Sequence, residues 1–251
     1  ATSKNPLLRF DLGYVYEQLQ QRWYHADDDP VALLRAEARA RNPWVQQRIW
    51  EKYGLPVSVL DLGCGAGFLS NALAKQGHRV TGIDQAENAL HVARAHDGTG
   101  TVQYLLGDAR ALSFTPESFE VVCAMDVLEH VLPWQGVVAE ASRVLKPGGL
   151  FIFYTFNRTL LAWLFAVKGI EWVVKNTPKN LHLHAMFITP GELAAACEGL
   201  GMVSEKVVGF GPKVFSRAFG KLLLTGRVPP DFEFRLQKGL QLGYLGLARK
   251  R

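Results

Sequence analysis

A glycine-rich turn directly after a short apolar run constrains the fold of this chain more than any other feature. Residues 59–62 are apolar except for Asp61, and they lead into Gly63-Cys64-Gly65-Ala66-Gly67, after which helix-compatible residues begin. Glycine adopts positive φ without steric cost, so alternate glycines allow a sharp strand-to-helix turn that a ligand can approach closely. The turn by itself fits a nucleoside site or a connection without a ligand.

Short apolar runs alternate with helix-like segments after Pro56. The runs cover residues 57–62, 79–83, 102–106, 119–125 and 150–156. Strands that alternate with crossover helices predict a parallel sheet with helices on both faces, and two later runs, 203–209 and 240–248, are suited to its last strands. Residues 146–149 (Lys-Pro-Gly-Gly) predict a turn before the fifth strand, and residues 189–192 (Thr-Pro-Gly-Glu) predict a capping box.

The length of 251 residues predicts one catalytic domain with embellishments. Residues 1–54 mix helical periodicity with polar breaks, including Asp27-Asp28-Asp29-Pro30, and we expect them to form an N-terminal helical lid. Residues 55–251 then form the catalytic domain, in which we expect an amphipathic insertion over residues 157–188.

The charge and the cysteine content limit the possible partners of the protein and its cellular compartment. The net charge of +5 comes from Lys and Arg scattered along the chain, which argues against nucleic acid and leaves an anionic membrane surface open. Cys64, Cys123 and Cys197 show no pairing pattern or zinc spacing, so we expect a reducing, cytoplasmic compartment. No apolar run approaches the ~20 residues that span a bilayer.

Three acids follow predicted strands at one edge of the sheet and favour a particular ligand. Asp84 ends the second strand, where its carboxylate can accept hydrogen bonds from both hydroxyls of a ribose. Asp61 would repel a pyrophosphate but suits a ligand that carries an ammonium and a sulfonium. Asp108, in Gly107-Asp108-Ala109 after the third strand, can accept from an adenine amino group. The set predicts S-adenosylmethionine rather than a nicotinamide dinucleotide.

The predicted fourth strand ends in Met125 and is followed by residues 126–130, Asp-Val-Leu-Glu-His. If Asp126 begins a helical turn, Glu129 and His130 share its face. Two carboxylates and an imidazole on one face can hold a hard divalent cation, or can act as a base and its orienting group without metal. A substrate-binding or capping role for the same residues is the alternative.

Together, the glycine turn, Asp84, Asp108 and the end of the fourth strand resemble the class I methyltransferase fold over roughly residues 56–156. The resemblance implies a Rossmann-like α/β domain with a seven-stranded, mostly parallel sheet, a reversed final strand and helices on both faces. It places Gly63 and Gly65 against the methionine part of the cofactor and Met125 beside the adenine or sulfonium. The remaining residues expected at the cofactor are Asp61, Cys64, Asp84, Gln85, Asp108 and Ala109.

Further motifs extend the resemblance to roughly residues 40–195, through residues 155–158 (Thr-Phe-Asn-Arg) and 189–192. In order and spacing they are similar to the ubiquinone-biosynthesis O-methyltransferase family, whose members methylate polyprenyl catechols. The resemblance implies that Asp126, Glu129 and His130 bind Mg²⁺ or another divalent cation.

Two positions depart from the family pattern. The family's cofactor-contacting arginine falls on Val45, and Arg41 and Arg48 are the neighbouring candidates to replace it. The family's Thr-His-Asp stretch is Leu181-His182-Leu183 here, so the identity of the acceptor stays open.

Residues 160–167 form an unbroken apolar run that is too short to span a bilayer. Tryptophans beside lysines are typical of a helix at a lipid interface, so we expect Trp163, Phe165 and Trp172 to face lipid. The lysines expected near anionic headgroups are Lys168, Lys175 and Lys179. A second, weaker basic patch is expected over residues 213–222, and a buried helix or a dimer contact is the alternative for the first.

The sequence therefore predicts an S-adenosylmethionine-dependent O-methyltransferase that acts on a prenylated catechol or phenol in quinone biosynthesis, at the cytoplasmic face of a membrane. In-line methyl transfer needs alignment and a deprotonated phenol, so Asp126, Glu129 and His130 are the expected catalytic residues, with a cation or His130 activating the phenol. Expected partners are the acceptor, an anionic membrane, and a second copy of the chain or other quinone-biosynthesis enzymes. The alternatives are a methyltransferase for another small hydroxylated or carbon acceptor, and a non-catalytic membrane-binding scaffold.

Overall fold

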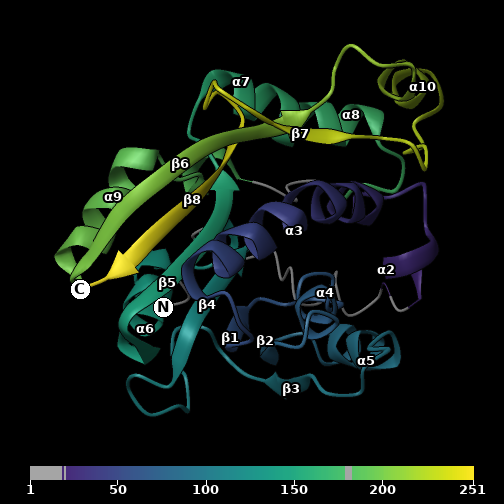
Figure 1. Cartoon of the computed structure of the whole chain (residues 1–251). Helices are drawn as coiled ribbons and strands as arrows, with labels where there is room; N and C mark the ends of the chain where they lie inside the picture. Colours follow the sequence, from purple (N-terminus) through teal and green to yellow (C-terminus); the bar gives the residue numbers. More distant parts are fainter. Residues whose placement is uncertain (1–18, 20, 179–182) are drawn as a thin grey trace, which may run out of the picture.

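The computed structural model describes residues 19, 21–178 and 183–251 of the chain. Within these residues, eight strands form one mixed sheet in the order β3-β2-β1-β4-β5-β8-β6-β7 (Figure 1). The strands β1 to β5 are parallel, while β8 is antiparallel to both β5 and β6, and β7 is antiparallel to β6. The strand bounds are β1 Ser58–Leu62, β2 Arg79–Asp84, β3 Gln103–Leu106, β4 Phe119–Met125, β5 Leu145–Phe156, β6 Met202–Pro212, β7 Phe234–Gln237 and β8 Gly243–Lys250.

The predicted α/β fold is confirmed, with its five parallel strands and a reversed strand inside the sheet. The predicted number of seven strands is wrong, because Phe234–Gln237 adds β7 at the edge beside β6. Since β7 is only four residues long and its side chains are partly or fully exposed, no apolar run marks it in the sequence.

Helices cover both faces of the sheet, as the alternation of strands and helices predicts. On one face, α6 (Trp134–Val144) and α9 (Pro190–Gly199) pack into the largest apolar cluster. On the other, α3 (Val31–Tyr53) and α4 (Ser70–Ala74) form a second cluster with β1, β4 and β5, and α5 (Glu87–Ala95) packs beside β2 and β3.

The expected N-terminal lid begins outside the described residues and then forms α2 (Arg22–His25) and α3. Figure 1 shows α3 lying along the sheet, with α2 at its N-terminal end. Val45 and Ile49 of α3 are fully buried in the core of the catalytic domain. The second half of α3 therefore packs into the core of the catalytic domain.

Two local motifs are found where the sequence places them. The Thr189 side chain and the Glu192 side chain form the predicted capping box at the start of α9. The turn at residues 146–149 is also present, but it lies inside β5: Leu145 already pairs with Phe119, and pairing resumes between Leu150 and Val121.

A helical cap lies beyond the end of the sheet in Figure 1, formed by residues 160–173 and α10 (Arg217–Thr225). The first segment, within the expected insertion 157–188, runs as α7 (Leu160–Ala162), a π-helical stretch η3 (Trp163–Gly169) and α8 (Ile170–Val173). Residues 179–182 of that insertion, which include Lys179, lie outside the described residues. The short 3₁₀ helices are η2 (Leu128–His130) and η4 (His184–Met186).

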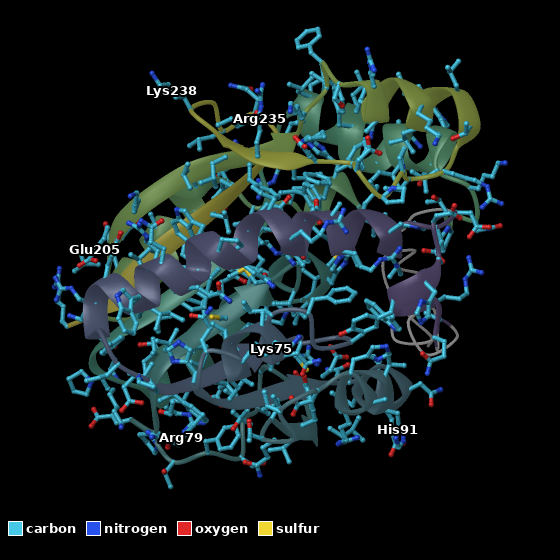
Figure 2. All side chains as sticks on the ribbon, turned by 45° about the vertical axis from the view of Figure 1, so that its right-hand side comes forward. Lys75, Arg79, His91, Glu205, Arg235 and Lys238 are labelled. Carbon is cyan, nitrogen blue, oxygen red and sulfur yellow. The ribbon has the colours of Figure 1, made fainter. Side chains whose placement is uncertain are left out.

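The excess of basic residues is spread over the surface. Figure 2 shows Arg79 near the bottom of the view and Arg235 and Lys238 near the top, with Lys75 between them, and all four are exposed. This distribution agrees with the absence of a dense basic block in the sequence.

Replacing Gly67 with alanine tests the packing behind the glycine turn. Gly67 has a φ of +80°, and an added Cβ would collide with the Tyr104 hydroxyl, whereas Gly100 has a φ of +63° with no atom within 4 Å of such a Cβ. We expect Gly100→Ala to lower the free energy of unfolding by about 1 kcal/mol through backbone strain, and Gly67→Ala to lower it by about 1 to 3 kcal/mol more through overpacking. Urea denaturation of both variants measures the difference, and equal losses would contradict the contribution of the contact.

Candidate functional site

The turn between β1 and α4 has the backbone that its glycines predict. Gly63, Gly65 and Gly67 have φ of +63°, +50° and +80°, in the left-handed region that strains other residues. The Asp84 carboxylate fixes the turn, because the backbone N–H groups of Gly65 and Ala86 donate to it at 2.8 and 2.9 Å. Asp84 is thereby held at the end of β2 with its carboxylate beside the turn.

A cavity of about 320 Å³ opens over this turn, at the carboxyl ends of the parallel strands. All but one of the predicted cofactor-binding residues line it. Those that do are Asp61, Gly63, Cys64, Gly65, Asp84, Gln85, Ala109 and Met125.

Asp108 is the exception among the predicted cofactor-binding residues. Its carboxylate pairs with the Arg110 guanidinium at 2.7 Å and also accepts from the Arg110 backbone N–H at 2.8 Å. The Asp108 side chain is thus held by Arg110, while its neighbours Gly107 and Ala109 line the cavity.

Asp61 is a buried acid on the wall of this cavity. Its side chain is 1% exposed and accepts a hydrogen bond of 2.6 Å from the Ser70 hydroxyl. Burial raises the pKa of Asp61 to about 6, and the hydrogen bond from Ser70 opposes that rise. Because desolvation disfavours the ionised form, a cationic group bound beside Asp61 would stabilise the carboxylate.

Two aromatic residues of the N-terminal segment close over the glycine turn, and the sequence analysis missed both. Trp23 of α2 is 4% exposed and lines the cavity, and a Cβ on Gly65 would lie 3.3 Å from its ring. The Tyr24 hydroxyl donates to the Ala66 carbonyl at 2.9 Å. Both residues precede the part of the chain that carries the motifs, so no spacing pattern pointed to them.

A buried ion pair between Arg41 of α3 and Asp126, just after β4, forms the next part of the site. Asp126 has a φ of +54°, an unusual backbone for a residue other than glycine. The Arg41 guanidinium also lies over the Tyr154 ring, 5.1 Å from its centroid. Burial lowers the pKa of Arg41, but the charges of Asp126 and Glu37 outweigh it and raise the pKa overall.

Of the two arginines that could replace the family residue at Val45, only Arg41 lines the cavity over the glycine turn. Arg48 pairs instead with Glu51 at 2.6 Å. Within the described residues, the Nε and Nη1 atoms of Arg41 are buried without a hydrogen-bond partner. Arg41 thus presents donors that an anionic group could satisfy.

Two buried acids, Glu129 and Glu37, lie near Asp126 of this ion pair. Glu129 accepts a hydrogen bond of 2.8 Å from Thr155, and it lines neither cavity. Burial, and then the charge of Asp126, raises the pKa of Glu129 to about 8. Glu37 is 5% exposed, and burial followed by the charge of Asp126 raises its pKa well above the ordinary value.

The predicted cation site does not fit this arrangement. Asp126 is engaged by Arg41, and Glu129 is hydrogen-bonded to Thr155 away from the cavities. In the part of the chain that the structure describes, no group of three His, Cys, Asp or Glu side chains is arranged to hold a metal ion. The expectation from spacing failed because residues 128–130 form a 3₁₀ turn after a left-handed Asp126, so the three side chains do not share a helical face.

A second cavity, of about 500 Å³, is mostly apolar and lies between the sheet and the helical cap. Its walls come from α3, β5, β6, α8 and α10, with Leu33, Tyr154, Phe210, Val173 and Leu222 as representatives. Asp126, His130 and Leu34 line both this cavity and the one over the glycine turn. The two cavities therefore meet at Asp126 and His130.

Some side chains of residues 160–175 face the apolar cavity and others face the surface. Phe165 lines the apolar cavity, and Trp163 is half-buried against a small apolar cluster. Trp172, by contrast, is 70% exposed. Lys168 pairs with Glu171 at 3.1 Å, and Lys175 is exposed. Phe165 thus lies on the cavity side of this segment, whereas Trp172 lies on its outer side.

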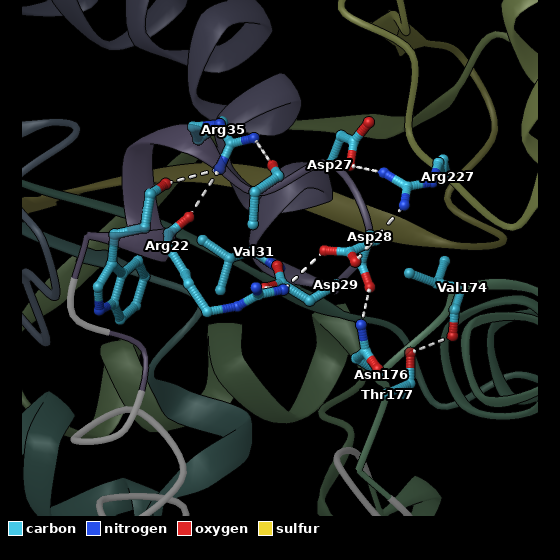
Figure 3. Close-up of polar contacts among 12 residues, drawn as sticks. Arg22, Asp27, Asp28, Asp29, Val31, Arg35, Val174, Asn176, Thr177 and Arg227 are labelled. Atoms are coloured by element: carbon cyan, nitrogen blue, oxygen red, sulfur yellow. Dashed lines mark hydrogen bonds and ion pairs between the residues drawn. The ribbon is translucent and has the colours of Figure 1, made fainter.

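The loop of three aspartates before α3 ties the cap to the N-terminal helices (Figure 3). Arg227, which follows α10, pairs with Asp27 at 2.6 Å, and Asn176, which follows α8, donates to the Asp28 carbonyl at 3.0 Å. Arg22 of α2 pairs with Asp29 at 2.8 Å. Both halves of the cap are thus attached to the segment that covers the glycine turn.

Comparison with known proteins identifies the fold and the domain. A family model for a methyltransferase domain matches residues 60–153. The magnesium protoporphyrin IX methyltransferase of Synechocystis matches 96% of this chain and 100% of that chain, with a TM-score of 0.64 and 16% identity. A methyltransferase from Thermotoga maritima matches 95% and 99%, with a TM-score of 0.63 and 18% identity. With the site described above, these likenesses define a class I S-adenosylmethionine-dependent methyltransferase.

Sequence relatives narrow this class to a family. Ubiquinone biosynthesis O-methyltransferases from Pseudomonas fluorescens and Thiobacillus denitrificans are each 37% identical, over 77% of this chain and 83% of the relative. The enzyme of the same name from Hahella chejuensis is 39% identical, over 76% and 80%. The chain belongs to the ubiquinone biosynthesis O-methyltransferase family, as its motifs predicted.

Proposed function

We propose that this methyltransferase transfers a methyl group to a hydroxyl of a prenylated catechol or related phenol in ubiquinone biosynthesis. One observation carries the proposal: the polar cavity over the glycine turn and the larger apolar cavity meet at Asp126 and His130. An aromatic ring with an apolar tail suits the second cavity, and its hydroxyl would then reach the residues that both cavities share.

The residues around the glycine turn fit S-adenosylmethionine. Asp84 is suited to accept from the ribose hydroxyls, and Asp61 to stabilise the positive charge of the methionine part. The buried donors of Arg41 are suited to the methionine carboxylate, since a buried N–H group without a partner costs free energy. When bound, S-adenosylmethionine supplies an electrophilic methyl group on its sulfonium.

His130 is the residue that we assign as the base. It lines both cavities, so an acceptor hydroxyl at their junction would be within reach of the imidazole. Arg41 fixes the neighbouring Asp126 by their ion pair, and the apolar walls exclude water from the junction. In this proposal the chain contributes alignment, a base and a dry site, and no step passes through a metal ion.

The outer face of the cap is proposed to contact an anionic membrane. Among the described residues, no helix has the length and apolar character needed to cross a bilayer. Large apolar side chains are nevertheless exposed on both parts of the cap: Leu160, Leu164, Trp172, Phe215, Leu223 and Leu224. Lys175, Arg217 and Lys221 are exposed beside them, and apolar and basic side chains together suit an anionic interface. A prenylated acceptor could then enter the cavity from lipid.

Replacing Asp84 tests the placement of the cofactor. Asp84→Ala should weaken the binding of S-adenosylmethionine by about 1.5 to 3 kcal/mol for each charge-assisted hydrogen bond that it removes. Asp231→Ala is the matched control, because its side chain is exposed and lines neither cavity. Calorimetry measures both, and unchanged affinity in Asp84→Ala would refute the assignment.

A panel of acceptors tests the reaction itself. We expect S-adenosylmethionine and prenylated catechols to give methylated products by mass spectrometry, with and without a chelator. His130→Ala should lower kcat by about 100-fold or more, as expected for loss of a base. His91→Ala, which changes an exposed histidine outside both cavities, should not. If activity disappears with chelator and returns with Mg²⁺, the reaction needs a divalent cation after all. If no acceptor gives a product, the proposed function is refuted.

Vesicle flotation tests the membrane contact. Lys175→Glu with Lys221→Glu should weaken binding to anionic vesicles at low salt, since each lysine near the surface contributes about 1 kcal/mol, and should matter less at high salt because of screening. Lys52→Glu with Lys75→Glu is the matched control, with exposed lysines away from the cap. Wild-type protein that stays unbound at low salt would exclude the interface.

A further inference from the structure

The acceptor cavity carries a feature that the proposed reaction does not use. Among the described residues, three carboxyl side chains line this mostly apolar space: Asp29, Glu37 and Asp126. Two of them are engaged by arginines. Asp29 pairs with Arg22 and also accepts from the Val31 backbone N–H at 3.1 Å, and Asp126 pairs with Arg41. Glu37 instead has the Tyr154 side chain as a neighbour, which also lines this cavity.

Glu37 lies beside the junction of the two cavities. It precedes Arg41 by four residues on α3, so the two side chains emerge one turn apart on the same side of the helix. Arg41 lines the cofactor cavity and Glu37 lines the acceptor cavity, while their common neighbour Asp126 lines both. A group bound at the junction therefore has Glu37 next to it on the acceptor side.

Burying the Glu37 carboxyl costs free energy, and a ligand that hydrogen-bonds to it would offset that cost. The residue is 5% exposed and faces apolar walls, and a buried carboxyl costs free energy unless its oxygens are hydrogen-bonded. A carboxyl group has room for several hydrogen bonds, so Glu37 can accept one from a ligand in the cavity that it lines. The buried acid Glu129 lines neither cavity, so it cannot contact a ligand bound there.

We propose that Glu37 is a specificity-determining residue that accepts a hydrogen bond from the second hydroxyl of a vicinal dihydroxy-aromatic acceptor, the one next to the hydroxyl that is methylated. This inference rests on the proposed function. The two hydroxyls of a catechol are neighbours on the ring, so when one lies at Asp126 and His130 the other can face Glu37. The residue would select catechols over phenols with one hydroxyl, because a site built to bond a hydroxyl discriminates against analogues that lack it.

The test compares two acceptors that differ by one group: a short-chain prenylated catechol and the matched phenol without the second hydroxyl. Glu37→Leu and Glu37→Ala remove the carboxyl, and Glu37→Gln keeps one oxygen that can accept. Glu51→Leu is the matched control, on the same helix but exposed and outside both cavities. Kinetics give kcat and KM for each acceptor, and calorimetry gives the affinity for S-adenosylmethionine.

We expect the wild type to favour the catechol by roughly 10- to 100-fold in kcat/KM, because the phenol leaves the buried carboxyl of Glu37 without this hydrogen bond. Glu37→Leu and Glu37→Ala should lose that preference through a higher KM for the catechol, with the phenol unaffected. Glu37→Gln should keep most of it, and Glu51→Leu all of it. Affinity for S-adenosylmethionine should stay unchanged, because Glu37 does not line that cavity and a folded variant retains it.

Three results would overturn the inference. A preference that survives in Glu37→Leu and Glu37→Ala would show that another group binds the second hydroxyl. Equal losses on both acceptors with retained cofactor affinity would assign Glu37 a general role in the site. A wild type that methylates the phenol as well as the catechol would leave the proposed function standing and remove this inference, whereas methylation of neither acceptor would remove both.

Discussion

The buried ion pair between Arg41 and Asp126 determines how the two cavities meet. Asp126 follows β4 with a strained, left-handed backbone, and Arg41 comes from α3, whose second half packs on the sheet. A buried charge that loses its partner costs about 3 to 5 kcal/mol, so the pair fixes the position of α3 along β4. That position brings Glu37 to the apolar cavity, one turn before Arg41, and leaves Arg41 on the cofactor side.

The cofactor side of the site could largely be predicted from sequence because backbone requirements mark it. Glycines with positive φ and acids at strand ends are tied to local geometry, so Gly63, Asp61 and Asp84 were found by type and spacing. The ion pair between Asp108 and Arg110 could not be predicted, because spacing along the chain does not encode side-chain contacts. The sequence could not decide whether Arg41 or Arg48 faces the cofactor cavity. The two arginines are seven residues apart, so they lie on the same face of the helix, about 10 Å apart along its axis.

The acceptor side was less predictable, since apolar residues fit a cavity wall and a lipid surface equally well. Hydrophobic periodicity assigns faces at 3.6 residues per turn, but Trp163–Gly169 is π-helical, so the faces shift within the segment. Phe165 turns inward while Trp172 stays exposed. The sequence also lacked any signal that α10 would lie beside residues 160–173. Such contacts join segments that are far apart in the sequence, as the ion pair between Arg227 and Asp27 also does.

The short helix α2 connects the two halves of the site physically. Its adjacent residues Arg22 and Trp23 line different cavities, Arg22 the acceptor cavity and Trp23 the cofactor cavity. A helix of four residues has little stability of its own, and Arg35 holds this one by donating to the Trp23 carbonyl at 2.7 Å. The same short helix therefore forms part of the wall of both cavities, and the ion pair between Arg22 and Asp29 links it to the loop that holds the cap.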